Sequence, residues 1–253
     1  MGSESSEGIV LRVIEFSESS LIVTFFTRNL GKVVAIAKGA RRPKSSFEGA
    51  LDLLAVCRLL IIVKGGESLD LLTEAKLERR FRAGQCDLNR LYAGFYFAEL
   101  VKELTDRDDP HPEVYELLCQ GLRDLDTPID IASAVLRFEL HLLRSLGHAP
   151  NMHACASCGI ARQTPWHERK TFLFSALAGG IICERCRSIV GGLIQLRSFS
   201  CNWIDQVLTA EAYFSEDSPP LPECRAELRG AMNQYFSHLC GGPLRMTRYL
   251  SLL

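Results

Sequence analysis

The sequence predicts an α+β multidomain protein with a small N-terminal β-barrel and an α-helical C-terminal domain that carries a four-cysteine zinc module. Three observations lead to this fold class. Segments rich in β-forming residues fill positions 8–80, hydrophobic residues take a helical period from about position 87, and two C-x-x-C pairs lie between the helical stretches. We expect the domains to occupy residues 1–80 (barrel), 81–150 (helical domain, first part), 151–195 (zinc module) and 196–253 (helical domain, second part).

Five segments are expected to be strands of the barrel, with a long loop between the third and the fourth: 8–14, 21–27, 32–38, 54–63 and 69–75. The first three form a meander, because short turns separate them. Five strands in about 70 residues suit a small closed barrel such as an OB-fold. Strand propensity alone fits an SH3-like barrel equally well.

The helical region contains recognisable helix starts and ends. Asp87 is expected to cap one helix, and Pro112 to begin the next. Thr127, with an acidic Asp130 three residues later, predicts a third helix that ends at Gly147. Two more helices are expected after the cysteines, and their predicted boundary residues are Ser200 for the first, and Pro222 and Gly241 for the second.

The zinc module is predicted from four cysteines whose two pairs are separated by 24 residues: Cys155, Cys158, Cys183 and Cys186. Four thiolates leave no open coordination position, so one structural Zn²⁺ is the favoured interpretation over a redox pair or a lapsed site. Gly159 is expected to have positive φ, and Phe172 and Phe174 to cover the metal. His153 and His167 are interpreted as solvated loop residues rather than as ligands.

The apolar content and the cysteines indicate the cellular compartment in which the protein works. No apolar run reaches the ~20 residues that a membrane span needs, and residues 1–7 are polar without a signal pattern, so we expect a cytoplasmic protein with no membrane partner. The remaining cysteines are scattered singly in apolar surroundings, which predicts buried free thiols in a reducing compartment. They are Cys57, Cys86, Cys119, Cys201, Cys224 and Cys240.

Charge is unevenly distributed although the formal net charge is only −1. In residues 38–44, called the basic loop below, four of seven residues are basic and none is acidic. Residues 99–130 hold ten acidic and three basic residues. The sequence therefore predicts a cationic surface in the barrel, followed by an anionic region.

Motifs for common enzymatic chemistry are absent from the sequence. It contains no G-x-x-x-x-G-K-[ST] loop, no G-x-G-x-x-G fingerprint and no H-E-x-x-H, and it lacks the zinc-deaminase signature. We therefore expect no enzyme activity and no nucleotide cofactor. A zinc hydrolase would also require an open metal site.

Three stretches, taken together and in order, resemble the bacterial recombination mediator family RecO. They are residues 9–12 through the basic loop to Ser45, then residues 136–147 leading into Cys155-x-x-Cys158-Gly159, and residues 243–250. The resemblance spans almost the whole chain. It implies an N-terminal OB-fold, a helical domain and, as in the zinc-bearing members, a module with both cysteine pairs.

The resemblance also implies a non-catalytic role in DNA repair and recombination. Such proteins bind single- and double-stranded DNA, anneal complementary strands without ATP and, with RecR, help to load RecA onto DNA coated by single-strand-binding protein (SSB). It further implies a place in the cytoplasm, associated with the nucleoid. The alternative is a zinc-stabilised scaffold for protein interactions with incidental DNA affinity.

Site residues follow from the charge pattern and the resemblance. Lys38, Arg41, Arg42 and Lys44 are the predicted DNA contacts, with Arg28 and Lys32 as weaker candidates; a solvated polar loop is the alternative. Phe47 is either a stacking platform or a hydrophobic anchor. The resemblance implies that the acidic SSB tail binds the helical domain, where Arg137 and Arg144 are candidates, either for the tail or for salt bridges to residues 99–130.

Overall fold

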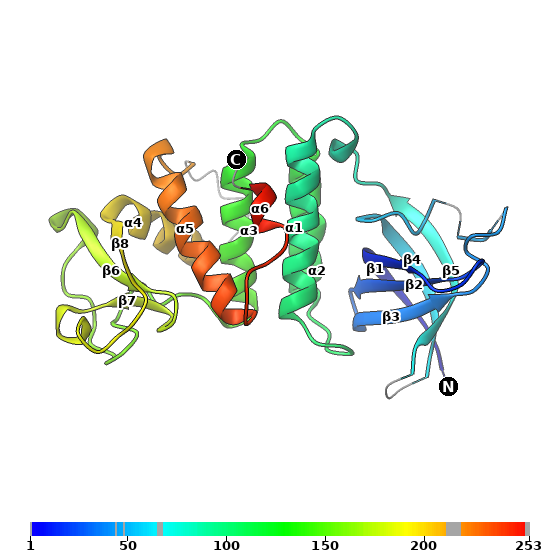
Figure 1. Ribbon diagram of the computed structural model, residues 1–253, viewed down its shortest axis with the longest axis horizontal. Coiled ribbons are helices and arrows are strands. Elements are labelled where there is room, and N and C mark those ends of the chain that lie inside the picture. Colours follow the sequence, from blue (N-terminus) through cyan, green and yellow to red (C-terminus); the bar gives the residue numbers. More distant parts are fainter. Residues whose placement is uncertain (1, 44, 48, 65–67, 211–218, 251–253) are drawn as a thin grey trace. The chain divides into compact units, whose positions relative to one another are not determined.

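The computed structural model describes residues 2–43, 45–47, 49–64, 68–210 and 219–250 (Figure 1). The chain forms two compact units that divide between Ile129 and Asp130. Unit 1 contains the five-stranded barrel and two helices, and unit 2 contains the remaining helices and a small sheet. Among the described residues, no helix is long and apolar enough to cross a membrane.

The barrel confirms the OB-fold prediction. Its strands close in the order β1-β2-β3-β5-β4, with β1 pairing β4. The β3–β5 pair is parallel and joins residues 35–37 to residues 70–72. The bounds are β1 (Gly2–Glu15), β2 (Leu21–Thr27), β3 (Gly31–Ala37), β4 (Val56–Val63) and β5 (Asp70–Arg79).

Alternate residues of each strand fill the barrel interior, and Val23, Phe25 and Ala35 are fully buried there. Phe47, from the loop before β4, is only 6% exposed in the same core, so it is a hydrophobic anchor and not a stacking platform. The predicted start of the first strand at Gly8 was wrong. Polar residues 2–7 extend β1 along β4, because backbone groups make the ladder whatever the side chains are.

Two helices complete unit 1, α1 (Leu88–Leu104) and α2 (Pro112–Leu125), after a short 3₁₀ turn, η1 (Ala83–Gln85). The side chain of Asp87 accepts hydrogen bonds from the backbone N–H groups of Asn89 and Arg90, which confirms the predicted cap. Pro112 begins α2 as predicted. Both helices contribute buried aromatic residues, among them Tyr96 and Tyr115, whereas Tyr92 and Phe95 of α1 are only partly buried.

Unit 2 begins with α3 (Ile131–Ser145), and the predicted cap at Thr127 was wrong. Asp130 is the N-cap instead, and its carboxylate accepts from the backbone N–H of Ser133 at 3.2 Å. The hydroxyl of Thr127 donates to the carbonyl of Asp124, 2.8 Å away, because it follows the end of α2. The helix therefore begins three residues later than predicted, directly before the apolar run.

The cysteine segment lies between α3 and α4 in the chain. It contains η2 (Trp166–Glu168), β6 (Thr171–Ser175), β7 (Gly180–Ile182), η3 (Glu184–Cys186) and β8 (Leu193–Arg197), and its sheet order is β7-β6-β8. The helices that follow are α4 (Ser198–Thr209), α5 (Pro222–Leu239) and α6 (Thr247–Leu250). Ser200 was wrong as a cap, because it is buried inside α4. Pro222 begins α5 as predicted.

Candidate metal centre and nucleic-acid interface

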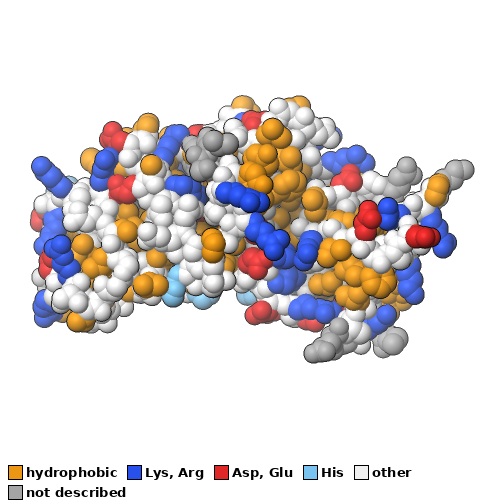
Figure 2. Space-filling view, in the orientation of Figure 1, with side chains coloured by type: hydrophobic (Ala, Val, Ile, Leu, Met, Phe, Trp, Pro, Cys, Tyr) orange, Lys and Arg blue, Asp and Glu red, His pale blue; other side chains and the backbone are white. Residues whose placement is uncertain are grey.

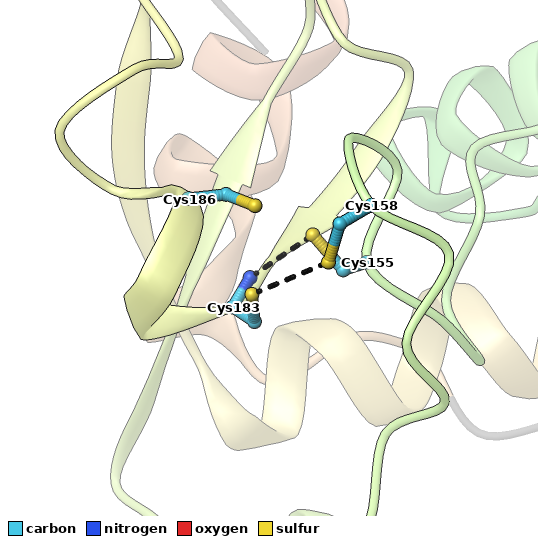
Figure 3. Close-up of side chains that lie close together, drawn as sticks. All are labelled: Cys155, Cys158, Cys183 and Cys186. Carbon is cyan, nitrogen blue, oxygen red and sulfur yellow. Dashed lines mark hydrogen bonds between the residues drawn. The ribbon is translucent and has the colours of Figure 1, made fainter.

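The four predicted zinc ligands come together in one cluster (Figure 3). Their Sγ atoms all lie within 4.8 Å of one another, and Cys158 Sγ is 3.7 Å from Cys183 Sγ. A tetrahedral zinc with Zn–S bonds of about 2.3 Å places its sulfurs about 3.8 Å apart. The cluster therefore fits a closed, four-thiolate metal site.

Backbone pairing between Asn151 and β7 brings the two cysteine pairs together. The N–H of Ile181 donates to Asn151 O at 3.0 Å, and the N–H of Ala156 donates to Ile181 O at 2.8 Å. This close approach needs a glycine at 180, where φ is +156° and an added Cβ would lie 2.4 Å from Asn151 O. This backbone pairing thus brings the four thiols close together.

Backbone N–H groups stabilise the thiolate form of Cys155. Burial alone raises the pKa of this thiol, but the N–H groups of Cys183, Cys158 and Ser157 together lower it to about 6. Cys183 N lies 3.3 Å from Cys155 Sγ (Figure 3). Gly159 has φ of +72°, as predicted, and its N–H donates to Cys155 O at 2.9 Å. Because the thiolate is the metal ligand, these N–H groups favour Cys155 as a ligand.

The predicted hydrophobic cover of the metal was wrong. Leu173 and Ile182 pack with the cysteines, whereas Phe172 and Phe174 do not belong to that cluster. Side chains alternate along β6, so its two phenylalanines face away from Leu173. Phe172 packs edge-on against Trp166 with the ring centroids 4.7 Å apart. Among the described residues the metal-binding group contains cysteines alone, without His153 or His167.

The remaining cysteines only partly match the prediction of buried thiols. Cys57, Cys119, Cys201 and Cys224 are buried and Cys240 is partly buried, but Cys86 is exposed. Cys86 follows η1, at the surface between the barrel and α1. Its immediate sequence neighbours, Gln85 and Asp87, are polar and fit this exposed position better than the predicted burial.

The basic loop is fixed against the turn between β1 and β2. The backbone N–H of Arg41 donates to Ser19 O at 3.1 Å, and its guanidinium donates to the carboxylate of Glu15 at 2.9 Å. Lys38, Arg41 and Arg42 are exposed. Lys44 lies outside the described residues. Three of the four predicted DNA contacts thus share one exposed loop.

Arg28 and Lys32 lie at the other end of the β2–β3 ladder, away from the basic loop. Arg28 forms ion pairs with Glu7 (2.9 Å) and Glu116 (2.6 Å) and lies over the ring of Tyr115. Lys32 Nζ donates to the carbonyls of Lys102 and Thr105, and burial lowers the pKa of this amine. Both side chains connect the barrel to α1 and α2, and their contact with DNA stays a prediction.

The predicted partner residues on α3 make contacts with α4. The guanidinium of Arg144 donates to the carbonyls of Leu208 and Ala210, at 3.0 and 2.6 Å, and Arg137 lies 5.9 Å from the ring centroid of Trp203. Arg144 therefore satisfies carbonyls at the end of α4. Its role in partner binding remains a prediction.

A pocket of about 510 Å³ lies in unit 2 beside α3 and α5, and the sequence analysis missed it. Val135, Leu136 and Leu250 provide apolar lining, and Arg225 and Arg229 add two cations. Arg225 pairs with Asp130 at 3.0 Å, and Arg229 pairs with the buried carboxylate of Glu139. The spacing of the two arginines on α5, four residues apart, was the available signal.

Comparison with known proteins shows to which family the chain belongs. Two family models, Recombination protein O N terminal and Recombination protein O C terminal, match residues 1–81 and 85–248. The chain belongs to this recombination protein O family. The DNA repair protein RecO of Rhodopirellula baltica is 48% identical, covering 96% of this chain and 97% of its own length. RecO proteins of Anaeromyxobacter sp. (32%; 96% and 94%) and Myxococcus xanthus (30%; 97% and 96%) are also similar over nearly their full lengths.

Membership of the RecO family assigns the chain to DNA repair and recombination. The matched residues include both the barrel and the cysteine-bearing region. The resemblance found in three short stretches of the sequence is thereby confirmed.

Proposed function

We propose that this RecO-family protein is a non-catalytic recombination mediator that binds DNA through the basic loop and anneals complementary strands. The observation that supports this most directly is the group of exposed cations, Lys38, Arg41 and Arg42, on a loop held against an OB barrel. Cations that neutralise phosphates release counterions, which gives affinity for any DNA sequence. OB barrels commonly bind single strands in this way.

Annealing needs no nucleotide hydrolysis in this proposal, because base pairing supplies the free energy. The protein reduces repulsion between phosphates and raises the local concentration of the second strand. Its contacts must be weak enough to release the finished duplex. In the cell this activity would act with RecR to load RecA onto single strands coated by SSB.

The test follows duplex formation between labelled complementary strands in nucleotide-free buffer. We expect the rate to pass through a maximum with protein concentration, since excess protein coats both strands separately, and to collapse at high salt. A rate equal to that of the strands alone, or one that requires ATP, would contradict the proposal. The scaffold interpretation would then replace it.

We propose further that the four cysteines hold one structural Zn²⁺. Cys155, Cys158, Cys183 and Cys186 would be its ligands, and a bound zinc would cross-link the Asn151–Gly159 segment to η3. The donor set of four thiolates supports this, because it leaves no position for a water molecule or a substrate.

We propose the pocket beside α3 and α5 as the binding site for the acidic C-terminal tail of SSB. Such a tail ends in an apolar side chain and a carboxylate, which suit the apolar lining of the pocket and its two arginines. Arg225→Gln should weaken binding of a tail peptide several-fold at low salt. Arg187→Gln, at an exposed arginine of the cysteine segment, is the matched control. A wild-type protein that fails to bind the peptide would reject this site.

A further inference from the structure

Side chains on the solvent-facing side of a sheet are usually polar. The outer face of this barrel instead carries a row of apolar side chains. In the strand register Ile14 pairs with Ile22, and Ile22 pairs with Ile36. Their neighbours Val13, Val23 and Ala35 belong to or pack against the barrel core. Because side chains alternate along a strand, the three isoleucines face outward.

The outward position agrees with the exposure of these side chains. Ile14 is 39% exposed, and Ile22 and Ile36 are partly exposed. The row continues around the barrel, since Ile36 pairs with Leu71 and Leu71 pairs with Ile62, and both are partly exposed. Figure 2 shows hydrophobic side chains at the surface of unit 1 beside Lys and Arg side chains.

An exposed aromatic ring lies at the edge of this row. Phe16 is 58% exposed in the turn between β1 and β2, where its N–H donates to Ser20 O at 3.0 Å. The basic loop is hydrogen-bonded to the same turn through Arg41 and Ser19. We define the apolar face as Ile14, Phe16, Ile22 and Ile36.

The charge around the apolar face favours a polyanion. Exposed cations nearby are Arg12, on the same side of β1 as Ile14, and three residues of the basic loop, Lys38, Arg41 and Arg42. The acidic residues of the turn are Glu15, which pairs with Arg41, and Glu18. Four cations against two acids border the same apolar surface.

We propose that the apolar face binds the unpaired bases of a single DNA strand while the basic loop holds its phosphates. The ring of Phe16 would stack on one base, and the isoleucine row would contact the next bases along the strand. A duplex buries its base faces against one another, so it can use only the cations. The apolar face would therefore give a preference for single strands, and this inference rests on the proposed DNA-binding function.

The test compares Phe16→Ala and Ile36→Thr with the wild-type protein on labelled single and double strands across a salt series. We expect Phe16→Ala to lower single-strand affinity by about tenfold, within the range for one aromatic–base stack. Duplex affinity and the slope of log K against log salt should not change, because no cation is lost. Leu53→Ala, at a 43% exposed residue of the loop before β4, is the matched control.

A second variant does not depend on a loss of affinity. Phe16→Trp keeps a large ring, and its fluorescence should be quenched by single strands and unaffected by duplex. If Arg41→Ala/Arg42→Ala weakens DNA binding while both apolar-face variants bind single strands like wild type, the inference is wrong and the proposed function stands. If none of these variants changes DNA binding, the proposed function itself fails.

Discussion

The guanidinium of Arg41 donates a hydrogen bond to the carboxylate of Glu15, 2.9 Å away. Glu15 thus already pairs with a side chain that we propose as a phosphate contact. The Arg41 side chain is 39% exposed and that of Glu15 is 72% exposed. An exposed pair of this kind is worth less than about 1 kcal/mol. If Arg41 contacts DNA as proposed, a phosphate can therefore displace Glu15 from it.

Removing the competing carboxylate should strengthen DNA binding. We expect Glu15→Gln to raise affinity for single and double strands about two- to fivefold at low salt, because Arg41 no longer exchanges one anion for another. Glu18→Gln removes the same charge from the same turn and controls for the change in net charge. Equal effects of the two variants would show that the ion pair itself does not matter.

Neutralising the basic loop should change the salt dependence of binding. If Arg41 and Arg42 neutralise two phosphates, changing both to Ala should lower the slope of log K against log salt by roughly 1.4 on single strands. Affinity should fall about equally for all sequences, since phosphates carry no sequence information. Titrations at several salt concentrations measure both quantities. An unchanged slope with unchanged affinity would show that the basic loop is only a solvated polar surface.

Loss of a cysteine ligand should destabilise unit 2 before unit 1. Structural zinc contributes ~10–16 kcal/mol of apparent binding free energy in finger peptides, more than a small sheet supplies alone. We expect Cys183→Ala to lose its zinc and to unfold the cysteine segment at a lower temperature. Cys86→Ala, at an exposed thiol outside the cluster, should keep both properties. Metal analysis of protein prepared without chelators should find one zinc per chain, and none would contradict the assignment.

Arg28 should matter for stability more than for DNA binding. Arg28→Met keeps the aliphatic stem but removes the ion pairs with Glu7 and Glu116, and we expect a loss of about 1 kcal/mol in the free energy of unfolding. Arg58→Met removes an exposed pair with Glu78 as a control. Denaturant unfolding measures the difference. A larger effect on DNA affinity than on stability would instead show that Arg28 contacts DNA.

The sequence predicted the features that depend on local chemistry. The β-rich segments, the cap at Asp87 and the helix start at Pro112 follow from neighbouring residues alone, and the spacing of the cysteines already indicated a closed metal site. The start of β1 was missed because pairing with β4 comes from the far side of the barrel. Backbone pairing of that kind leaves no hydrophobic pattern in the sequence.

The roles of several side chains depend on tertiary contacts that the sequence does not show. Arg28 and Lys32 are basic and near the loop in sequence, yet the ladder carries them to the helices. Phe16 follows the last strand residue in a polar turn, and only the register of β1, β2 and β3 reveals the apolar face beside it. Strand register is not encoded by composition, so the outward-facing apolar row beside Phe16 could not be recognised from the sequence.

The barrel closes through three parallel residue pairs between β3 and β5, whereas β1 and β2 share seven pairs. Parallel pairing is also slightly weaker per residue. Local opening should therefore begin at this seam, and amide hydrogens of residues 35–37 should exchange with solvent sooner than those of the β1–β2 ladder. Ile36 and Leu71 are paired across the seam, so a strand of DNA bound over both residues would hold β3 and β5 together. Slower exchange of these few amides on adding single strands would then report occupancy of the barrel without any label on either molecule.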